Sequence, residues 1–222
     1  MPPVKPSARV LCVGLNYAEH IDEGPFSRTD YPTVFGRWTQ SLAVADTPVA
    51  IPVDERGLDW EAKLLVAVGS RLSMADATEA HRSVFAYAAF NDITARRAQK
   101  LPTQWTLDKN VDNSGALSDL VTADEVGDPR GRTLMARVNG QVMQESTTDL
   151  MIFGIGEVLS FISRTLTLMP GDLVATGTRS GVGYSPTPPR LLEPGDTVDV
   201  EVEGIGAVST PIIATGARQH DT

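Results

Sequence analysis

The sequence contains almost no cysteine, no excess of positive charge and no long hydrophobic run. Cys12 is the only cysteine, so no internal disulfide can form, and its apolar neighbours are typical of a buried, inert thiol. No stretch approaches the ~20 apolar residues that a membrane-spanning helix needs. The formal net charge of −9 provides no basic face for nucleic acid. We therefore expect neither a membrane protein nor a nucleic-acid-binding protein.

The start of the chain lacks the features of a secretory signal, because its apolar run is short and no small-residue cleavage pattern follows. We therefore expect a cytoplasmic protein. The length of 222 residues, with 41% hydrophobic residues, suits one packed domain. We expect an N-terminal strand and lid segment over residues 1–50 and a catalytic domain over residues 51–222, which together form effectively one domain.

Glycine and proline are plentiful and spread along the chain, which favours many turns between short strands. The dipeptide Asn139-Gly140 after a strand-like run is a strong hairpin signal, and Gly204 separates two further strand-like runs. We expect an α+β, β-rich fold. The main expected strands are 9–16, 58–68, 84–90, 134–138, 197–203 and 205–212, and the expected helices lie near 17–23, 75–83 and within 149–163.

His20 and Glu23 are three residues apart and would share one face of a helix. The carboxylate could then orient the imidazole and raise its basicity, so that the pair could activate a water molecule. Taken alone, the pattern is more typical of a solvated helix surface than of a catalytic pair.

Several other residues are candidates for binding. Glu61 and Asp92 lie in or at the end of apolar, strand-like runs, where carboxylates can hold a hard cation or can simply be exposed. Lys109 could neutralise an anionic substrate or could be a surface charge. Thr178 lies in a glycine-rich stretch that offers hydroxyl groups and close backbone approach, or forms a hairpin.

Together these segments resemble the fumarylacetoacetate hydrolase (FAH) superfamily, in order, over about residues 9–213. The resemblance is carried by Cys12-Val-Gly-Leu-Asn-Tyr-Ala-Glu-His20-Ile-Asp-Glu23, Pro32-Thr-Val-Phe35, Leu58-Asp-Trp-Glu61, Phe90-Asn-Asp92-Ile-Thr-Ala-Arg96, Lys109-Asn-Val-Asp112, Val138-Asn-Gly140, Met151-Ile-Phe153, Pro170-Gly-Asp172, Thr176-Gly-Thr178, Gly181-Val-Gly183, Pro194-Gly-Asp196 and Glu203-Gly-Ile-Gly206. No single motif is decisive, but so many in order are very specific.

The resemblance implies an FAH-type mixed β-sandwich roll with short peripheral helices, a homodimer, and a Mg²⁺ or Mn²⁺ ion. It implies a small carboxylic acid substrate of the 1,3-dicarbonyl or acylpyruvate type. The matching positions give His20 and Glu23 as the water-activating dyad, Lys109 as a substrate-contacting catalytic lysine, Glu61 and Asp92 as metal ligands, and Thr178 and Arg37 as substrate-binding residues, with Arg37 at a position where the lid of the family usually offers a lysine. Separately, we expect residues 20–33 to form a lid that becomes ordered when a ligand binds.

The sequence departs from the family at a position that matters chemically. The family usually has Glu-x-Glu in its first metal-binding strand, whereas this chain has Glu61-Ala62-Lys63. Arg97 replaces a common acidic residue, and residues 113–119 replace an apolar stretch. A protonated lysine has three donors and no acceptor. Either Lys63 turns away and two carboxylates still hold the ion, or the Lys63 ammonium fills the position of the ion.

The favoured function is therefore carbon–carbon bond hydrolysis, or decarboxylation, of a 1,3-dicarbonyl or acylpyruvate-type acid, with an atypical metal site. The alternative is a metal-free, divergent member. It would be either an enzyme assisted by Lys63, which could also bind substrate, or a non-catalytic ligand-binding protein. A Schiff base on Lys63 is disfavoured, since two neighbouring carboxylates favour the charged amine.

Overall fold

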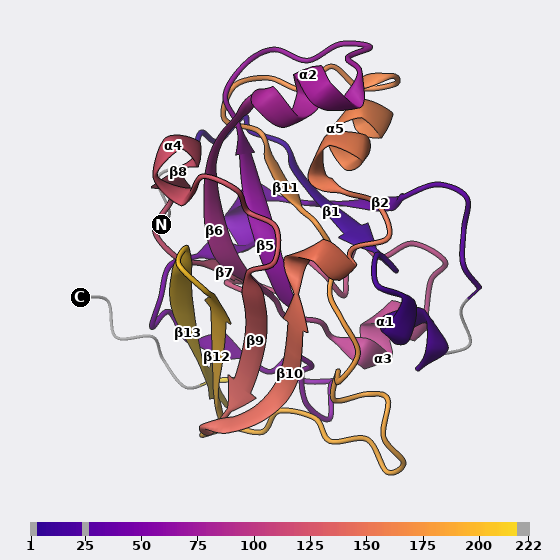
Figure 1. The fold of residues 1–222 in the computed structure, drawn as a ribbon. Helices are drawn as coiled ribbons and strands as arrows, with labels where there is room; N and C mark the ends of the chain where they lie inside the picture. Colours follow the sequence, from indigo (N-terminus) through magenta and orange to yellow (C-terminus); the bar gives the residue numbers. More distant parts are fainter. Residues whose placement is uncertain (1–3, 24–26, 217–222) are drawn as a thin grey trace.

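The computed structural model describes residues 4–23 and 27–216, which fold into two packed β-sheets with short helices at their edges (Figure 1). Part of the expected lid, residues 24–26, lies outside the described residues. This β-rich α+β architecture is the one predicted from the sequence.

The larger sheet has the strand order β2-β1-β11-β5-β6-β7-β3, with β8 also paired to β6. Most neighbours are antiparallel, but β1 runs parallel to β11 and β3 runs parallel to β7. Its strands are β1 (Val10–Gly14), β2 (Thr33–Arg37), β3 (Leu42–Ala43), β5 (Ala62–Val68), β6 (Val84–Asp92), β7 (Gly115–Leu117), β8 (Val121–Thr122) and β11 (Leu173–Ala175).

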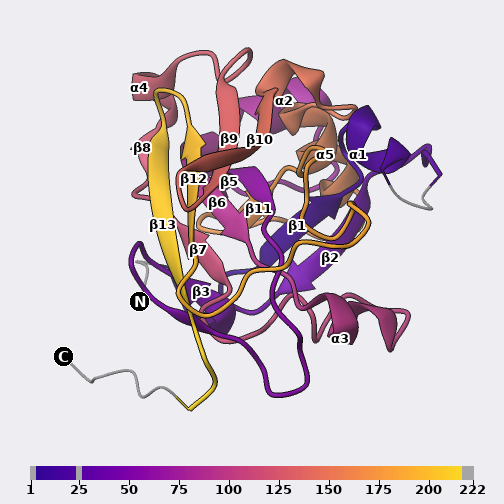
Figure 2. The same ribbon diagram turned by 90° about the horizontal axis from the view of Figure 1, so that it is seen from below.

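The smaller sheet has the order β10-β9-β12-β13-β4 and packs across β5 and β6 of the larger one (Figure 2). Its strands are β4 (Val49–Ala50), β9 (Thr133–Val138), β10 (Gln141–Thr147), β12 (Thr197–Val202) and β13 (Gly206–Ile213). Asn139 and Gly140 have φ values of 51° and 80° and form the turn between β9 and β10. Positive φ at both positions is the conformation that the Asn-Gly hairpin signal predicts.

The helices are short and peripheral, as expected. They are α1 (Ala18–Asp22), α2 (Ala77–Arg82), α3 (Arg96–Lys100), α4 (Ala123–Val126) and α5 (Ile155–Ser163), with 3-10 turns at Thr39–Ser41 and Thr148–Leu150. Asp76 caps the N-terminus of α2, and its side chain accepts hydrogen bonds from the Thr78 and Glu79 amides. The α2 helix packs against α5 at one end of the molecule (Figure 1). No described helix is long and apolar enough to cross a membrane.

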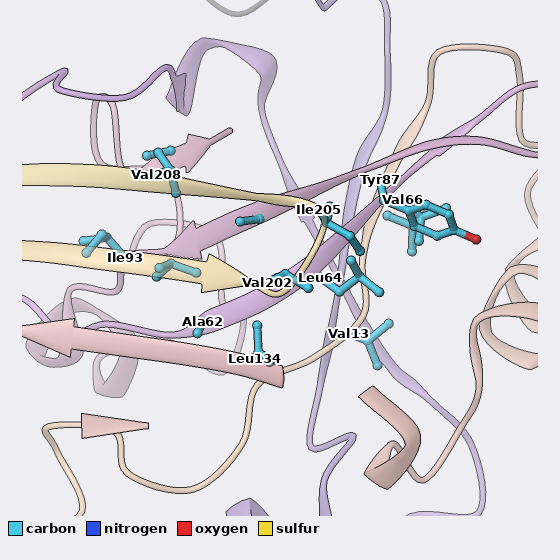
Figure 3. Packing of buried hydrophobic residues seen from close by; sticks show 14 of the residues in the cluster. Val13, Ala62, Leu64, Val66, Tyr87, Ile93, Leu134, Val202, Ile205 and Val208 are labelled. Atoms are coloured by element: carbon cyan, nitrogen blue, oxygen red, sulfur yellow. The ribbon is translucent and has the colours of Figure 1, made fainter. Parts of the chain in front are cut away.

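The central strand β5 is buried on both faces, and its alternation determines where the polar residues lie. Ala62, Leu64 and Val66 point between the two sheets and join the core shown in Figure 3. Leu65 belongs to a second apolar cluster on the opposite face, which also contains Cys12. Cys12 is fully buried, as predicted, and burial raises the pKa of its thiol to about 12.

The first 50 residues contribute strands to both sheets, since β1 and β2 lie in the larger sheet and β4 pairs with β13 in the smaller one. The boundary expected at residue 50 therefore lies at the end of β4. The N-terminal segment is part of the same packed body as the rest of the described chain.

Candidate active site

The site begins where β5 and β6 lie side by side. Glu61 directly precedes β5 and Lys63 is its second residue, so the two side chains share a face. Asp92 ends β6, and its backbone N–H donates to the Glu61 carbonyl over 2.9 Å. Strand alternation and cross-strand register therefore bring the two carboxylates and the lysine together.

Lys63 points directly at the two acidic side chains. Its Nζ lies 3.1 Å from Glu61 Oε2 and 2.5 Å from Asp92 Oδ2, and it donates to the Val13 carbonyl over 3.4 Å. The whole residue is 0% exposed. The three side chains thus converge, as the matching family positions imply, and the ammonium lies between the carboxylates.

Lys109 reaches the same two carboxylates from the loop after α3. Its Nζ lies 2.8 Å from Glu61 Oε2 and 2.9 Å from Asp92 Oδ2, and it donates to the Thr94 hydroxyl over 2.7 Å. One carboxylate oxygen from each acid is therefore shared by two ammonium groups.

Two arginines bind the remaining carboxylate oxygens. Arg96 donates from one nitrogen to Glu61 Oε1 over 2.9 Å and from Nε to Asp59 over 2.7 Å. Arg37 donates to Asp92 Oδ1 over 2.6 Å and also to the Ser114 hydroxyl. All four oxygens of Glu61 and Asp92 are thereby paired with positively charged groups.

Arg37 requires a correction. The sequence places it on a lid in contact with substrate, but it is the last residue of β2, its side chain is fully buried, and it lies behind Asp92. The neighbouring Asp92 carboxylate explains this position, because a buried anion in an apolar sheet needs a charged partner. Arg37 orients Asp92 and is not among the residues that line the cleft.

At Glu61, Asp92 and Lys63 the ion pairs outweigh the cost of burial. Burial would raise the pKa of Glu61 and Asp92, but Lys109 and Lys63 oppose it, and the pKa of Glu61 is held well below its usual range and that of Asp92 is lowered. Burial would lower the pKa of Lys63, but Asp92 and Glu61 raise it above the ordinary value. Lys63 is therefore a charged ammonium at neutral pH, which argues against a Schiff base there.

A cleft of about 440 Å³ opens above this cluster. Its polar lining includes His20, Glu61, Arg96, Lys109 and Thr178. Its apolar lining is formed mainly by Phe35, Trp105, Val182 and Tyr184. The cleft therefore has a positively charged floor and apolar walls, which suits a small carboxylate that carries an apolar portion.

His20 lies on α1 at the edge of this cleft. Its Nδ1 is 3.2 Å from Glu23 Oε2, and the other Glu23 carboxylate oxygen accepts a hydrogen bond from the Gly181 backbone amide. Glu23 is therefore held by a neighbouring loop while it contacts the imidazole. This leaves Nε2 as the ring nitrogen that is not engaged with Glu23.

Residues 9–213 match the family model described as fumarylacetoacetate (FAA) hydrolase C-terminal. The chain belongs to the fumarylacetoacetate hydrolase family. It is 35% identical, over 95% of its length and 68% of the relative's, to the oxaloacetate tautomerase FAHD2A, mitochondrial, of Bos taurus.

Solved structures of the family agree with this assignment. The 5-carboxymethyl-2-hydroxymuconate delta-isomerase from Mycobacterium smegmatis is 33% identical, with a TM-score of 0.84 over 96% of this chain and 81% of that one. A fumarylpyruvate hydrolase from Pseudomonas aeruginosa, in complex with Mn²⁺ and pyruvate, is 31% identical, with a TM-score of 0.83 over 96% of this chain and 91% of that one. These FAH-family relatives are enzymes, and one of them holds a divalent metal ion.

The side chains of this family member do not fit such an ion. Both oxygens of Glu61 and both oxygens of Asp92 already face cationic groups, and a protonated Lys63 offers no lone pair. A divalent cation between the carboxylates would meet two ammonium groups within about 3 Å of the oxygens it needs. Over residues 4–23 and 27–216, no group of three or more His, Cys, Asp or Glu side chains is placed to hold a metal.

Several residues of the site are not among those predicted from the sequence, and two of them, Arg96 and Gln144, make polar contacts to predicted residues. Arg96 lines the cleft and bridges Asp59 to Glu61. Its only sequence signal is its place in the segment that follows Asp92. Gln144 donates to the Thr178 hydroxyl over 3.1 Å and accepts from the Ala62 amide over 2.9 Å. A β-bulge between β9 and β10 turns Gln144 inward, and the sequence gives no sign of this bulge.

Thr178 lies in the cleft wall because the segment before it packs tightly on Asn16. The Asn16 side chain donates to the Phe153 and Thr176 carbonyls and accepts from the Phe153 amide. Since Gln144 donates to the Thr178 hydroxyl oxygen, the hydroxyl proton of Thr178 is available for an acceptor in the cleft.

Proposed function

We propose that this chain is an enzyme that hydrolyses a carbon–carbon bond in an acylpyruvate-type 1,3-dicarbonyl acid. The observation that carries the proposal is that the His20–Glu23 pair and the cationic floor around Lys109 open onto one cleft. The first can activate water, and the second can stabilise an enolate.

Binding of the acid depends on cations and on a hydroxyl donor. Lys109 is bound to two carboxylates and to the neutral Thr94 hydroxyl. The hydroxyl is the weakest acceptor of the three, so a substrate oxygen can replace it. Thr178 donates to the substrate carboxylate, and Arg96 adds positive charge to the same wall.

The reaction begins when His20, oriented by Glu23, removes a proton from water. The resulting hydroxide forms a bond to the distal acyl carbon. The bond between that carbon and the neighbouring methylene carbon then breaks, and its electron pair moves into a pyruvate enolate whose oxygen Lys109 stabilises. Protonation of the enolate carbon by His20 yields pyruvate and a carboxylic acid, and it returns the base to its starting state.

A second candidate reaction is keto–enol tautomerisation, supported by the 35% identity to an oxaloacetate tautomerase. It needs only proton transfer and the same enolate stabilisation, so it uses the same residues without a water nucleophile. Decarboxylation of oxaloacetate likewise needs only a stabilised enolate.

The test is steady-state turnover of acetylpyruvate and of oxaloacetate by the parent, His20→Ala and His81→Ala. His81 is exposed on α2 and is the matched control. We expect His20→Ala to lower kcat for acetylpyruvate by about 10²–10⁴-fold, and His81→Ala to have no effect. Turnover of oxaloacetate alone would favour the tautomerase or decarboxylase. A parent that binds pyruvate and turns over neither compound would be a non-catalytic binding protein.

We also propose that the protein forms a homodimer, as the family resemblance suggests, and that it acts in the cytoplasm. Light scattering after size-exclusion chromatography measures the assembly, and a monomer at micromolar concentration would contradict it.

A further inference from the structure

We infer that the Lys63 ammonium is a built-in cation that occupies the position of a divalent metal and makes this site independent of metal ions. The inference deepens the proposed function and rests on it only in assigning the cleft to an enolisable 2-oxo acid.

The hydrogen bonds of Lys63 show that its position is specific. A lysine ammonium has three N–H donors, and Lys63 has three acceptors within reach: the Val13 carbonyl and the carboxylates of Glu61 and Asp92. The amine therefore needs no solvent or ligand to complete its contacts. Turning Lys63 away would leave its charge without these acceptors in a fully buried place and would remove one cation from both acids.

The charge of the cluster supports the same conclusion. Its ion-paired groups are three carboxylates (Asp59, Glu61, Asp92) and four cations (Arg37, Lys63, Arg96, Lys109), so the net charge is one positive unit. Replacing Lys63 with glutamate removes two units of charge, and adding one divalent ion restores them. An anionic substrate therefore meets a cluster whose net charge equals that of a cluster with glutamate at position 63 and a bound divalent metal.

Lys63 and Lys109 have different roles in this arrangement. Lys109 lines the cleft and can touch a substrate oxygen, whereas Lys63 is fully buried and is not among the lining residues. The Phe35 ring lies 5.1 Å from Lys63 Nζ and 5.2 Å from Lys109 Nζ, and it helps to cover both charges. Lys63 is thus a positioning residue that acts through Glu61, Asp92 and Lys109. The substrate is held by hydrogen bonds and charge, without coordination to an ion.

Mn²⁺ binding tests the inference directly. Mn²⁺ is titrated into each chelator-treated protein, and the electron paramagnetic resonance signal measures how much Mn²⁺ stays free. The proteins are the parent, Lys63→Glu, and Lys5→Glu, which makes the same change of charge at an exposed lysine and serves as the control. We expect no binding by the parent or the control up to millimolar Mn²⁺, and at least tenfold tighter binding by Lys63→Glu. Binding of Mn²⁺ by the parent with a Kd below about 100 µM would overturn the inference, and this measurement requires no variant to fold.

Oxalate, a stable mimic of the pyruvate enolate, supplies the second measurement. Calorimetric titration in EDTA should give the same oxalate affinity for the parent as titration without EDTA. Lys63→Met should bind oxalate at least tenfold more weakly, with no rescue by Mn²⁺, whereas Lys63→Glu should bind it only when Mn²⁺ is present. Loss of oxalate binding by the parent in EDTA would overturn the inference. Thermal melting of each variant, with and without Mn²⁺, confirms that it is folded.

The two proposals fail in different ways. A parent that binds oxalate in EDTA but turns over neither acetylpyruvate nor oxaloacetate would refute the enzymatic proposal and leave the built-in cation intact. A parent whose turnover is abolished by EDTA and restored by Mn²⁺ would be the proposed enzyme, and it would refute the built-in cation.

Discussion

Arg96 joins two buried acids that lie on different segments of the chain. Its guanidinium binds Asp59 and Glu61 through separate nitrogens, and Asp59 also accepts hydrogen bonds from the Gly183 and Tyr184 amides. Through Asp59, the Arg96 side chain thus links Glu61, at the floor of the cleft, to the loop that contains Gly183 and Tyr184. A planar fork can do this, whereas the point charge of a lysine cannot reach both acids in the same way.

We predict that Arg96→Met lowers the free energy of unfolding by roughly 3–5 kcal/mol, because it leaves two buried carboxylates without a shared partner. Arg96→Lys should lie between the parent and Arg96→Met. Urea unfolding followed by circular dichroism measures the change. Arg130→Met is the control, since Arg130 pairs with Asp128 on the exposed surface and should leave the midpoint unchanged. Equal midpoints for parent and Arg96→Met would show that the bridge does not stabilise the fold.

At the scale of elements, the segment after β11 takes its shape from the close approach of two backbones. Gly177 has φ of +123°, and a Cβ atom placed there would lie 2.6 Å from Asn16 Cβ. Glycine is therefore required for both its conformation and its size. The contact positions the next residue, Thr178, in the cleft.

We predict that Gly177→Ala destabilises the protein by about 2–5 kcal/mol, from backbone strain together with the clash, and raises KM for a 2-oxo acid. Gly195→Ala is the matched control, because Gly195 has φ of +100° but a Cβ atom there meets nothing within 4 Å. It should cost only about 1–3 kcal/mol of strain and leave KM unchanged. Thermal melts and steady-state kinetics on both variants test this. Equal effects would mean that Asn16 does not restrict the loop.

At the scale of the whole molecule, the buried ion pairs of Glu61 and Asp92 make stability depend on pH in a definite direction, whereas at Asp59 burial outweighs the pairing with Arg96 and raises the pKa of that carboxyl. Burial raises the pKa of Glu61 and Asp92, but Lys109 and Lys63 reverse this, so both folded-state values lie below those of the unfolded chain. Their stabilisation is therefore complete above the unfolded pKa, near 4, and is lost as the pH falls from there towards the folded values.

We predict that the free energy of unfolding falls steeply below about pH 4.5, by about 1.4 kcal/mol for each unit by which a pKa is lowered. Urea titrations at pH 7, 5, 4 and 3 measure this. Asp128 controls for surface acids, since hydrogen bonds and charge from Arg130 lower its pKa to about 2 on the exposed surface. Asp128→Asn should retain most of the acid sensitivity. If that substitution abolishes it, the buried cluster does not dominate acid unfolding.

The parts of the fold that were predictable from the sequence depend on short-range rules. Strand alternation places Glu61 and Lys63 on one face, the Asn139-Gly140 turn defines a hairpin, and the apolar run before Asp92 forms a buried strand. The ordered motifs indicated the family, which the match over residues 9–213 establishes. Each of these features depends on residues close together in the chain or on a pattern carried by the whole sequence.

The remaining features depend on contacts between distant segments. The inward turn of Gln144 follows from a bulge in its pairing with β9, and the burial of Arg37 follows from the position of Asp92, 55 residues away. The sequence by itself determined that position 63 carries a positive charge where the family has a carboxylate. Only the tertiary structure decided that this charge lies between Glu61 and Asp92, because the direction of a buried ammonium depends on the acceptors that other strands bring to it.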